Sequence, residues 1–440
     1  MSTGLKPRQL KGGTSLSRVL LALVTLLSLL SGCASRPMSR VPRPTATERA
    51  SVASPEAGPT LGASPGPLPL WYLTRGGPKA DLAMAVDVDN QSCVYLGAHQ
   101  QAAGQLFTDM VIHKFSPEGA ELWQTRWGGN YQEKAFVITV SPPMVYVGGL
   151  KHRGIGLDDA DMAILALDMQ DGHLVWEFTW GQSYGYQEVD GLLVDGDHIY
   201  ASGWTTGEET SNDIAILKLE KKTGLLVWVK TWGGSGYDTA NGQMVLDQES
   251  IFVCGRIDGL NYALGGHAYV AKFSKMTGEY VVHKTWSGKL MEDAYGMTSD
   301  GTFLYLVGIT LSHGNGGQVF VLKYDKRLNL IWEQIWGGKK GESSRAIAVD
   351  EEGRILVAGH TDSFGAGGND VMLLQYSPEG KLNWSNTWGG PANDTVGGLA
   401  LRGGLAYMAG ETFSLAAGAN DALLLLADAR TGQFPAFKAP

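Results

Sequence analysis

The chain has 440 residues, of which 44% are hydrophobic and 18% charged, a composition typical of a globular protein. Its formal net charge is −9, and removal of the four basic residues of segment 1–32, which holds no acid, would leave −13. Such an acidic body argues against a nucleic-acid partner, because it offers no basic surface for phosphates. The 60 glycines indicate many tight turns and therefore many short strands.

Residues 1–32 are typical of a bacterial secretory signal. Basic residues extend to Arg18, and an apolar run from Val19 to Leu30 follows. That run is shorter than the roughly 20 residues that a membrane-spanning helix needs. The next residues, Ser31-Gly32-Cys33, resemble the lipobox of bacterial lipoproteins. The resemblance implies acylation of Cys33, palmitate included, and a lipid anchor in the cell envelope.

The residue after Cys33 indicates which membrane holds the anchor. Ala34 stands there instead of an aspartate, and in the sorting pattern of lipoproteins this favours the outer membrane. Residues 33–67 form the predicted tether, because seven prolines and very few large apolar residues cannot build a core. The anchor and tether therefore predict that the membrane is one partner of the protein.

A tryptophan-glycine motif recurs at nearly constant spacing through the rest of the chain. Its copies begin at Trp127, Trp180, Trp232, Trp286, Trp336 and Trp388, after a degenerate copy at Arg75. The spacings are 52, 53, 52, 54, 50 and 52 residues. Repeats of this length are the signature of solenoids and propellers.

Residues 337–388 show the order of elements within one unit. Strands are predicted at 345–349, 355–359, 371–376 and 382–388, with turn residues between each pair. Four short strands per unit are typical of a propeller blade. The last unit lacks its tryptophan strand, whereas Leu70 to Thr74 supply one near the other end of the domain. The sequence therefore predicts an all-β, seven-bladed β-propeller over 68–440, in which residues 68–75 complete the last blade and close the ring.

The unit resembles the bacterial seven-bladed β-propeller repeat (SBBP) family. The residues that carry the resemblance in one unit are Asp213, Gly224, Trp228 and Trp232-Gly233-Gly234. A weaker likeness to quinoprotein-type repeats rests on Lys222 to Trp228. Repeats of that kind also build the lipoprotein propeller of the outer-membrane β-barrel assembly machinery. Both resemblances imply the fold and leave the activity open, because propellers host binding, scaffolding and catalysis alike.

One acidic residue follows each motif by six to eight positions. These are Asp81, Glu133, Glu188, Asp238, Asp293, Glu342 and Asp394. Carboxylates at equivalent positions of seven blades would form an acidic ring at one mouth of the channel, which could bind Ca²⁺ if several converged. The alternative is that each acid bonds backbone N–H groups within its own blade, and its presence in every unit favours this structural role.

The position after the glycine of the second strand varies within a constant frame. It holds Ala98, Leu150, Trp204, Arg256, Ile309, His360 and Glu411. We expect these residues on loops at the face of the acidic ring. The four with functional side chains, Trp204, Arg256, His360 and Glu411, form a candidate ligand-binding rim.

Catalytic motifs are poorly represented. The nine histidines show no metal-ligand spacing, and no nucleophile elbow, P-loop or dinucleotide motif appears. Cys93 and Cys254 are predicted to be buried thiols. We therefore expect a non-catalytic binding scaffold with a monomeric body, no cofactor apart from possible Ca²⁺, and an envelope protein or a saccharide as ligand. The alternatives are a component of an outer-membrane protein assembly complex, or a propeller enzyme such as a quinone-dependent dehydrogenase or a polysaccharide lyase.

Overall fold

The tryptophan of each tryptophan-glycine motif is the last residue of the outermost strand of its unit in the computed structural model. The structure describes residues 70–77, 79–101, 104–155, 159–182, 185–206, 211–261, 264–314, 316–416 and 418–438. The predicted signal segment, Cys33 and the tether up to residue 67 lie outside these residues. Among the described residues, no helix has the length and hydropathy that a membrane span requires.

The first three units are four-stranded and antiparallel. The first consists of β2 (Asp81–Val88), β3 (Val94–Gln101), β4 (Thr108–Phe115) and β5 (Glu121–Trp127). The second consists of β6 (Glu133–Ser141), β7 (Met144–His152), β8 (Ala160–Asp168) and β9 (Leu174–Trp180). The third consists of β10 (Gln187–Asp195), β11 (His198–Thr206), β12 (Asn212–Glu220) and β13 (Leu226–Trp232).

The fourth unit has a broken inner strand. It consists of β14 (Tyr237–Ala240), β15 (Val245–Leu246), β16 (Ser250–Asn261), β17 (Leu264–Ser274) and β18 (Tyr280–Trp286). One parallel pair, Asn212 with Tyr237, joins this unit to the third, so that the two count as one nine-stranded sheet. The fifth consists of β19 (Glu292–Ser299), β20 (Phe303–Thr310), β21 (Gln318–Asp325) and β22 (Leu330–Trp336).

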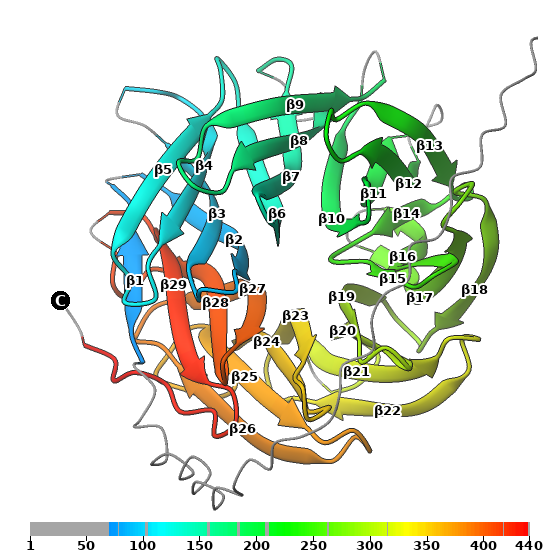
Figure 1. The fold of residues 1–440 in the computed structure, drawn as a ribbon. Coiled ribbons are helices and arrows are strands. Elements are labelled where there is room, and N and C mark those ends of the chain that lie inside the picture. Colours follow the sequence, from blue (N-terminus) through cyan, green and yellow to red (C-terminus); the bar gives the residue numbers. More distant parts are fainter. Residues whose placement is uncertain are drawn as a thin grey trace, which may run out of the picture. The chain divides into compact units, whose positions relative to one another are not determined.

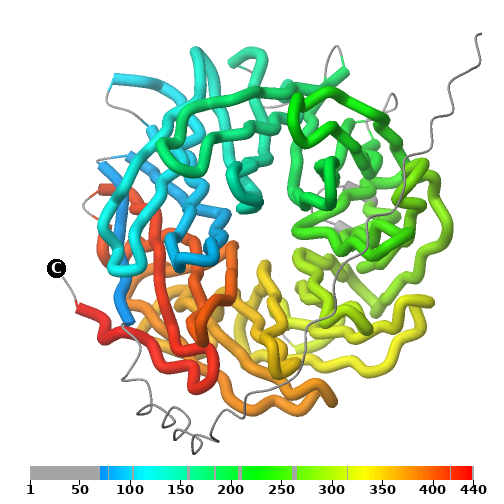
Figure 2. The backbone as a smooth tube through the Cα atoms, in the orientation of Figure 1, coloured from blue at the N-terminus to red at the C-terminus, as the bar shows by residue number. Residues whose placement is uncertain are grey.

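The last two units differ in where their outermost strand comes from. The sixth consists of β23 (Glu342–Val349), β24 (Ile355–Thr361), β25 (Asp370–Tyr376) and β26 (Leu382–Trp388). The last combines β27 (Asp394–Arg402), β28 (Leu405–Thr412) and β29 (Asp421–Asp428) with β1 (Tyr72–Arg75) from the start of the described chain. Tyr72 pairs with Leu425 in this sheet, and Figure 2 shows the blue start of the chain beside its red end.

The sheets surround a central opening, with the first strand of each unit innermost (Figure 1). Seven apolar clusters hold neighbouring sheets together, and one of them joins the first and last units through Leu96 and Leu424. This arrangement is compatible with the seven blades and the ring closure expected from the repeats. Cys93 and Cys254 are buried free thiols, as predicted.

The first tryptophan of a unit packs on a turn of the next unit. Trp123 is an example: its indole Nε1 donates to the carbonyl of Met169 at 3.3 Å. A Cβ on Gly172, whose φ is +77°, would lie 2.6 Å from the ring of Trp123. Five further seams repeat this contact, through Trp71/Gly119, Trp176/Gly224, Trp228/Gly278, Trp332/Gly380 and Trp384/Gly432. The tryptophan pattern of the sequence is therefore largely a pattern of contacts between blades.

The first glycine of the motif has no room for a side chain. A Cβ on Gly128 would overlap the carboxylate of Asp109, the second residue of the third strand of the same unit. Gly76, Gly181, Gly233 and Gly389 meet Asp421, Asp161, Asp213 and Asp370 in the same way. The residue that follows the tryptophan is therefore glycine because the aspartate of the third strand fills the space where a side chain would lie.

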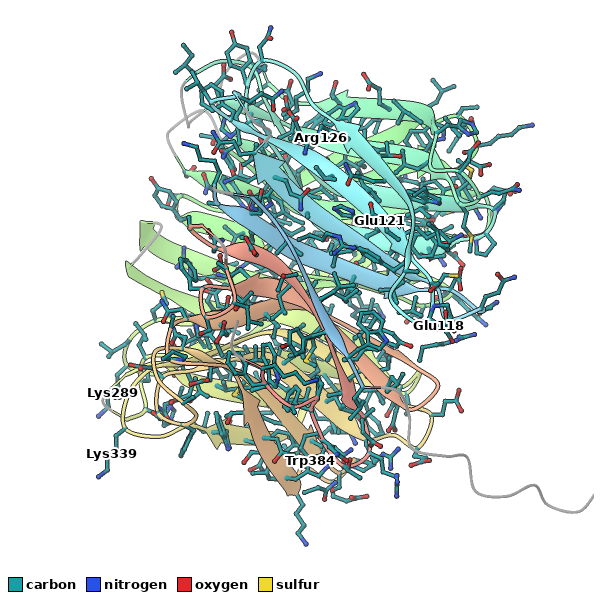
Figure 3. The ribbon with its side chains drawn as sticks, turned by 90° about the vertical axis from the view of Figure 1, so that its left-hand side faces the viewer. Glu118, Glu121, Arg126, Lys289, Lys339 and Trp384 are labelled. Carbon is teal, nitrogen blue, oxygen red and sulfur yellow. The ribbon has the colours of Figure 1, made fainter. Side chains whose placement is uncertain are left out.

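The ring has two distinct faces. Lys289 and Lys339, on loops that join neighbouring units, lie at one end of the ring, and Glu118, in the β4–β5 turn, lies at the other (Figure 3). We call the first end the linker face and the second the hairpin face. The residues predicted to form the acidic ring and the rim lie toward the linker face, because they begin first strands or end second strands.

Candidate binding site in the central channel

Five residues of the predicted acidic ring have a structural role within their own units. In each case the carboxylate accepts a hydrogen bond from the backbone N–H of a glycine four residues earlier in the chain. The five are Asp81, Glu133, Asp238, Glu342 and Asp394, with N···O distances of 2.8, 3.2, 2.6, 3.0 and 2.7 Å. All five side chains are buried, so they hold the turn between units and do not face a ligand.

The other two residues, Glu188 and Asp293, are not equivalent to these five, which corrects the predicted ring. The equivalent positions are one residue earlier: Glu292 accepts from Gly288 N at 2.8 Å, and Gln187 is the first residue of β10. Successive side chains of a strand point to opposite sides, so a shift of one residue reverses the direction of the side chain. Glu188 and Asp293 consequently line a cavity in the channel.

The first strand of each unit, or in the fourth unit the segment that follows β14, contributes a further residue to that cavity at an equivalent position. These residues are Met84, Phe136, Asp190, Asn241, Tyr295, Arg345 and Gly397. All but Asn241 lie at a β-bulge, where the register of the first and second strands shifts. The pairing with the second strand skips this residue, and the alternation of the strand points its side chain to the same side as the residue two positions earlier, as with Asp190 and Glu188. The cavity has a volume of about 210 Å³.

Trp204 and Glu188 form one wall of this cavity. The indole Nε1 of Trp204 donates to Glu188 Oε1 at 2.7 Å, and the phenol of Tyr186 donates to Oε2 at 2.9 Å. The rings of Trp204 and Tyr186 are stacked, with centroids 4.9 Å apart. Burial raises the pKa of Glu188, whereas the hydrogen bonds from Tyr186 and Trp204 oppose that shift. The carboxylate is therefore oriented on both oxygens.

Arg256 and Asp293 lie on the adjoining wall. The two side chains are buried, and Arg256 Nη1 lies 3.7 Å from Asp293 Oδ2. Asn241 Nδ2 donates to the other carboxylate oxygen of Asp293 at 2.9 Å. Burial raises the pKa of Asp293 to about 6, and the charge of Arg256 is the largest opposing influence. The two residues form a salt bridge. The raised pKa shows that the charge of Arg256 and the hydrogen bond from Asn241 offset only part of the cost of burying the Asp293 carboxylate.

His360 and Glu411 line a second cavity of about 500 Å³, together with His99 and Lys134. Asn420 Nδ2 donates to Glu411 at 2.5 Å, and burial raises the pKa of this carboxyl. Burial lowers the pKa of His360 to about 4 and that of His99 to about 3, so both imidazoles are neutral at pH 7.

The structure thus distributes the four predicted rim residues between two cavities. Trp204 and Arg256 line the first, and His360 and Glu411 line the second. All four lie in strands and not, as expected, in loops. Each is paired with a residue of an innermost strand, as Trp204 is with Glu188. Arg345 lines both cavities and a third of about 270 Å³.

Sequence reasoning missed Asp190 and Arg345. The sequence does contain a signal for them. In six units the fourth residue of the first strand differs from unit to unit while the surrounding pattern is kept, just as the residue after the second-strand glycine does. The second and fourth residues of a strand point to the same side, so the alternation that places Glu188 in the channel also places Asp190 there.

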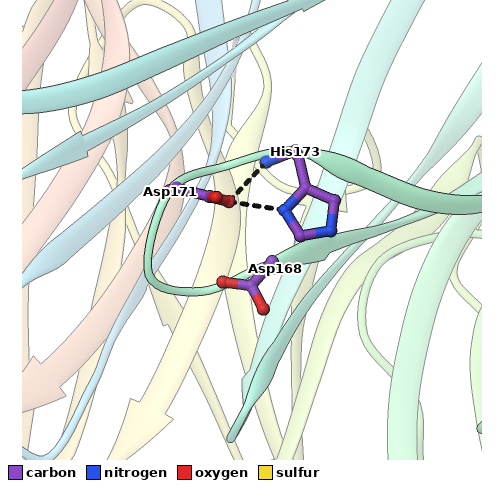
Figure 4. A group of neighbouring side chains, drawn as sticks. All are labelled: Asp168, Asp171 and His173. Carbon is purple, nitrogen blue, oxygen red and sulfur yellow. Dashed lines mark hydrogen bonds and ion pairs between the residues drawn. The ribbon is translucent and has the colours of Figure 1, made fainter.

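The possible Ca²⁺ site is not formed by the acidic ring within the described residues. The group of potential ligands found there is Asp168, Asp171 and His173, in the β8–β9 turn (Figure 4). Asp171 Oδ1 accepts from the backbone N and from Nδ1 of His173, at 3.0 and 2.6 Å. Asp171 and His173 are exposed, and these bonds account for the cluster as ordinary turn structure.

Comparison with known families identifies the type of repeat in part of the chain. A family model described as outer membrane protein assembly factor BamB matches residues 108–265, which is less than half of the 440 residues. The repeats of this region therefore resemble those of that family. No curated protein matches the chain.

Solved structures with similar folds include a domain described as a β-propeller. The WD40 β-propeller domain of Doa1 has 12% identity and a TM-score of 0.50, covering 81% of this chain and 97% of its own. The hydrazine synthase of Kuenenia stuttgartiensis has 12% identity and a TM-score of 0.50, covering 75% and 93%. A europium-containing methanol dehydrogenase has 12% identity and a TM-score of 0.48, covering 84% and 80%. Identities this low show the fold alone: the chain is an all-β propeller, and its residues 108–265 are similar to the BamB family model.

Proposed function

We propose that this protein is a lipid-anchored β-propeller of the bacterial envelope that binds a ligand in its central channel without catalysing a reaction. The main support is the position of Arg345. Its side chain is exposed although it lies in the channel, and it lines all three adjoining cavities. Its guanidinium lies 5.1 Å from the ring centre of Tyr295, a contact that leaves its N–H donors available to a ligand.

The surroundings of Arg345 support binding by their rigidity and polarity. Glu188 and Glu411 are each held by two side-chain donors, and Asp293 is held by Asn241 beside Arg256. Groups fixed in this way lose little conformational entropy when a ligand binds. The lipid anchor on Cys33 and the location at the outer membrane remain part of the proposal, on the evidence of the lipobox-like sequence.

The proposal can be tested by ligand capture. Full-length protein in detergent would be dialysed against a small-molecule extract of the cell envelope, and retained compounds identified by mass spectrometry. We expect the wild type to enrich at least one compound that an Arg345→Glu variant does not. Arg327→Glu, which changes an exposed arginine of the β21–β22 turn, is the matched control and should behave as the wild type. Equal retention by all three proteins, or none by any, would contradict channel binding.

A second candidate function is favoured by the match of residues 108–265 to the outer membrane protein assembly factor BamB. In that case the propeller would be a component of an outer-membrane protein assembly complex. The test is co-purification of β-barrel assembly proteins with the full-length chain at its native level. Recovery of such proteins with both the wild type and Arg345→Glu would support this candidate through a surface outside the channel, and their absence would count against it.

A further inference from the structure

We infer that the first channel cavity binds the primary ammonium group of an organic cation, with Asp190 and Thr239 as its hydrogen-bond acceptors. This inference rests on the proposed binding function and adds the chemical class of the ligand. Both residues line the same cavity, from the neighbouring innermost strands β10 and β14. An ammonium group carries three N–H donors, which suits a site that offers unused acceptors.

Asp190 is the acceptor that the protein leaves unused. Its Oδ2 is buried and accepts no hydrogen bond within the described part of the chain. Buried carboxylate oxygens are ordinarily hydrogen-bonded, so an unsatisfied one calls for an explanation. Glu188 and Asp293, the other two acids of the cavity, both have donors from protein side chains. The difference singles out Asp190 as the carboxylate that a ligand would satisfy.

Thr239 provides a second, independent observation. Its side chain is 3% exposed and its Oγ1, like Asp190 Oδ2, has no hydrogen-bond partner among the described residues. It lines the cavity beside Arg256, with which it is paired across β14 and β16. A buried hydroxyl without a partner is costly, and a ligand N–H would remove that cost.

The balance of charge in the cavity favours a cation. Three acids, Glu188, Asp190 and Asp293, face two guanidinium groups, those of Arg256 and Arg345. Burial raises the pKa of Asp190 well above its ordinary value, and the charges of Glu188 and Asp293 add to this shift while Arg345 opposes it. Lys134, His99, His360 and Glu411 line the adjoining cavity. A single positive charge beside Asp190 would balance the three acids of the cavity against three cations.

The geometry favours an organic cation over a metal ion. The carboxylates of this cavity are not among the groups of described residues whose potential ligand atoms lie within 4.8 Å of one another. The indole of Trp204, which is 6% exposed, supplies an apolar wall on which a short alkyl chain could pack. The cavity of about 210 Å³ limits the ligand to a few carbon atoms at this end.

The inference can be tested by calorimetric titration of the full-length protein with butylamine and 1,4-diaminobutane at pH 7. We expect at least one of these amines to bind, and Asp190→Asn to weaken its binding at least tenfold. Asp197→Asn changes an exposed aspartate in the hairpin that follows the same strand and should leave the affinity unchanged.

Several outcomes would overturn the inference. Amine binding that is equal in the wild type and Asp190→Asn would do so, as would the absence of binding at millimolar amine. Heat from CaCl₂ that disappears in Asp190→Asn would identify a metal site instead. Binding of sodium butyrate that depends on Arg345, without amine binding, would reject the cation but retain the channel as a binding site. Thr239→Val is a second variant that should also weaken amine binding if Asp190→Asn does not fold.

Discussion

Trp204 and Glu188 are paired across β10 and β11 and joined by a hydrogen bond from the indole Nε1 to Oε1 at 2.7 Å. Trp204 is the tryptophan that lies outside the repeated motifs, and Glu188 is one of the two acids that depart from the structural position. The two residues that depart from the repeat pattern are therefore in direct contact with each other. Such local departures from a regular pattern are where function is to be expected.

Removal of the indole donor should destabilise the protein. Trp204→Phe leaves Glu188 Oε1 without that hydrogen bond, and we expect a loss of about 1–3 kcal/mol in the free energy of unfolding, measured with urea. The double variant Trp204→Phe/Glu188→Gln should lose less than the sum of the single changes, because the two residues interact directly. Additive losses would show that the bond contributes little.

The two glycines of one motif should differ in their tolerance of a side chain. Gly128→Ala places a Cβ against the carboxylate of Asp109, and we expect it to lower stability by about 1–3 kcal/mol. Gly129→Ala is the matched control, since its Cβ would approach no atom more closely than 3.8 Å. Thermal unfolding of both variants would test this, and a comparable loss in Gly129→Ala would disprove the steric explanation.

The seam that joins the start and the end of the described chain should depend on Trp71. Its indole donates to the carbonyl of Pro117 at 3.2 Å and covers Gly119. Trp71→Ala should lower the free energy of unfolding by about 2–3 kcal/mol, less than for a fully buried tryptophan. Val175→Ala, at an outer-strand side chain that is 46% exposed, should change stability little. Equal effects of both variants would show that this seam is not important for the ring.

Glu133 should make stability depend on pH. Burial raises its pKa from 4.5 to about 7 in the folded protein. The folded state therefore binds this proton more tightly than the unfolded state, and its contribution to stability is lost as the pH rises from about 4.5 to 7. Glu133→Gln can still accept from Gly129 but does not titrate, so it should flatten this dependence and be more stable than the wild type at pH 8, by on the order of 2–3 kcal/mol. Urea unfolding at pH 5 and pH 8 would test this, and an unchanged slope in the variant would contradict it.

Membrane attachment should depend on Cys33. Cys33→Ser removes the proposed acylation site, and we expect the protein to move from the membrane to the soluble fraction, because two or more acyl chains are needed for stable anchoring. Incorporation of labelled palmitate should be lost in parallel. Cys254→Ala, which removes a buried thiol, should remain in the membrane fraction. Membrane retention of Cys33→Ser would disprove the lipid anchor.

Much of the fold could be predicted because each blade is local in sequence. The predicted strand 382–388 coincides with β26, and the predicted strand 355–359 is extended in β24 only to Thr361. Leu70 to Thr74 were predicted as the missing strand of the last unit, and β1 pairs there with β29. Periodicity and turn residues act within a few residues, so a sequence pattern can report them.

The candidate site could be predicted only in part, because it depends on register and on contacts between distant units. The sequence by itself determined the repeats and much of their strand pattern, and it proposed Trp204, Arg256, His360 and Glu411 as one rim, which the structure divides between two cavities. Only the tertiary structure placed Glu188 and Asp293 in the channel, and only it brought Asp190 of β10 into one cavity with Arg345 of β23. A shift of one residue reverses a side chain, and the ring sets the distance between strands far apart in the chain. Neither the register of a strand nor the distance between distant strands is encoded in the local pattern of residues.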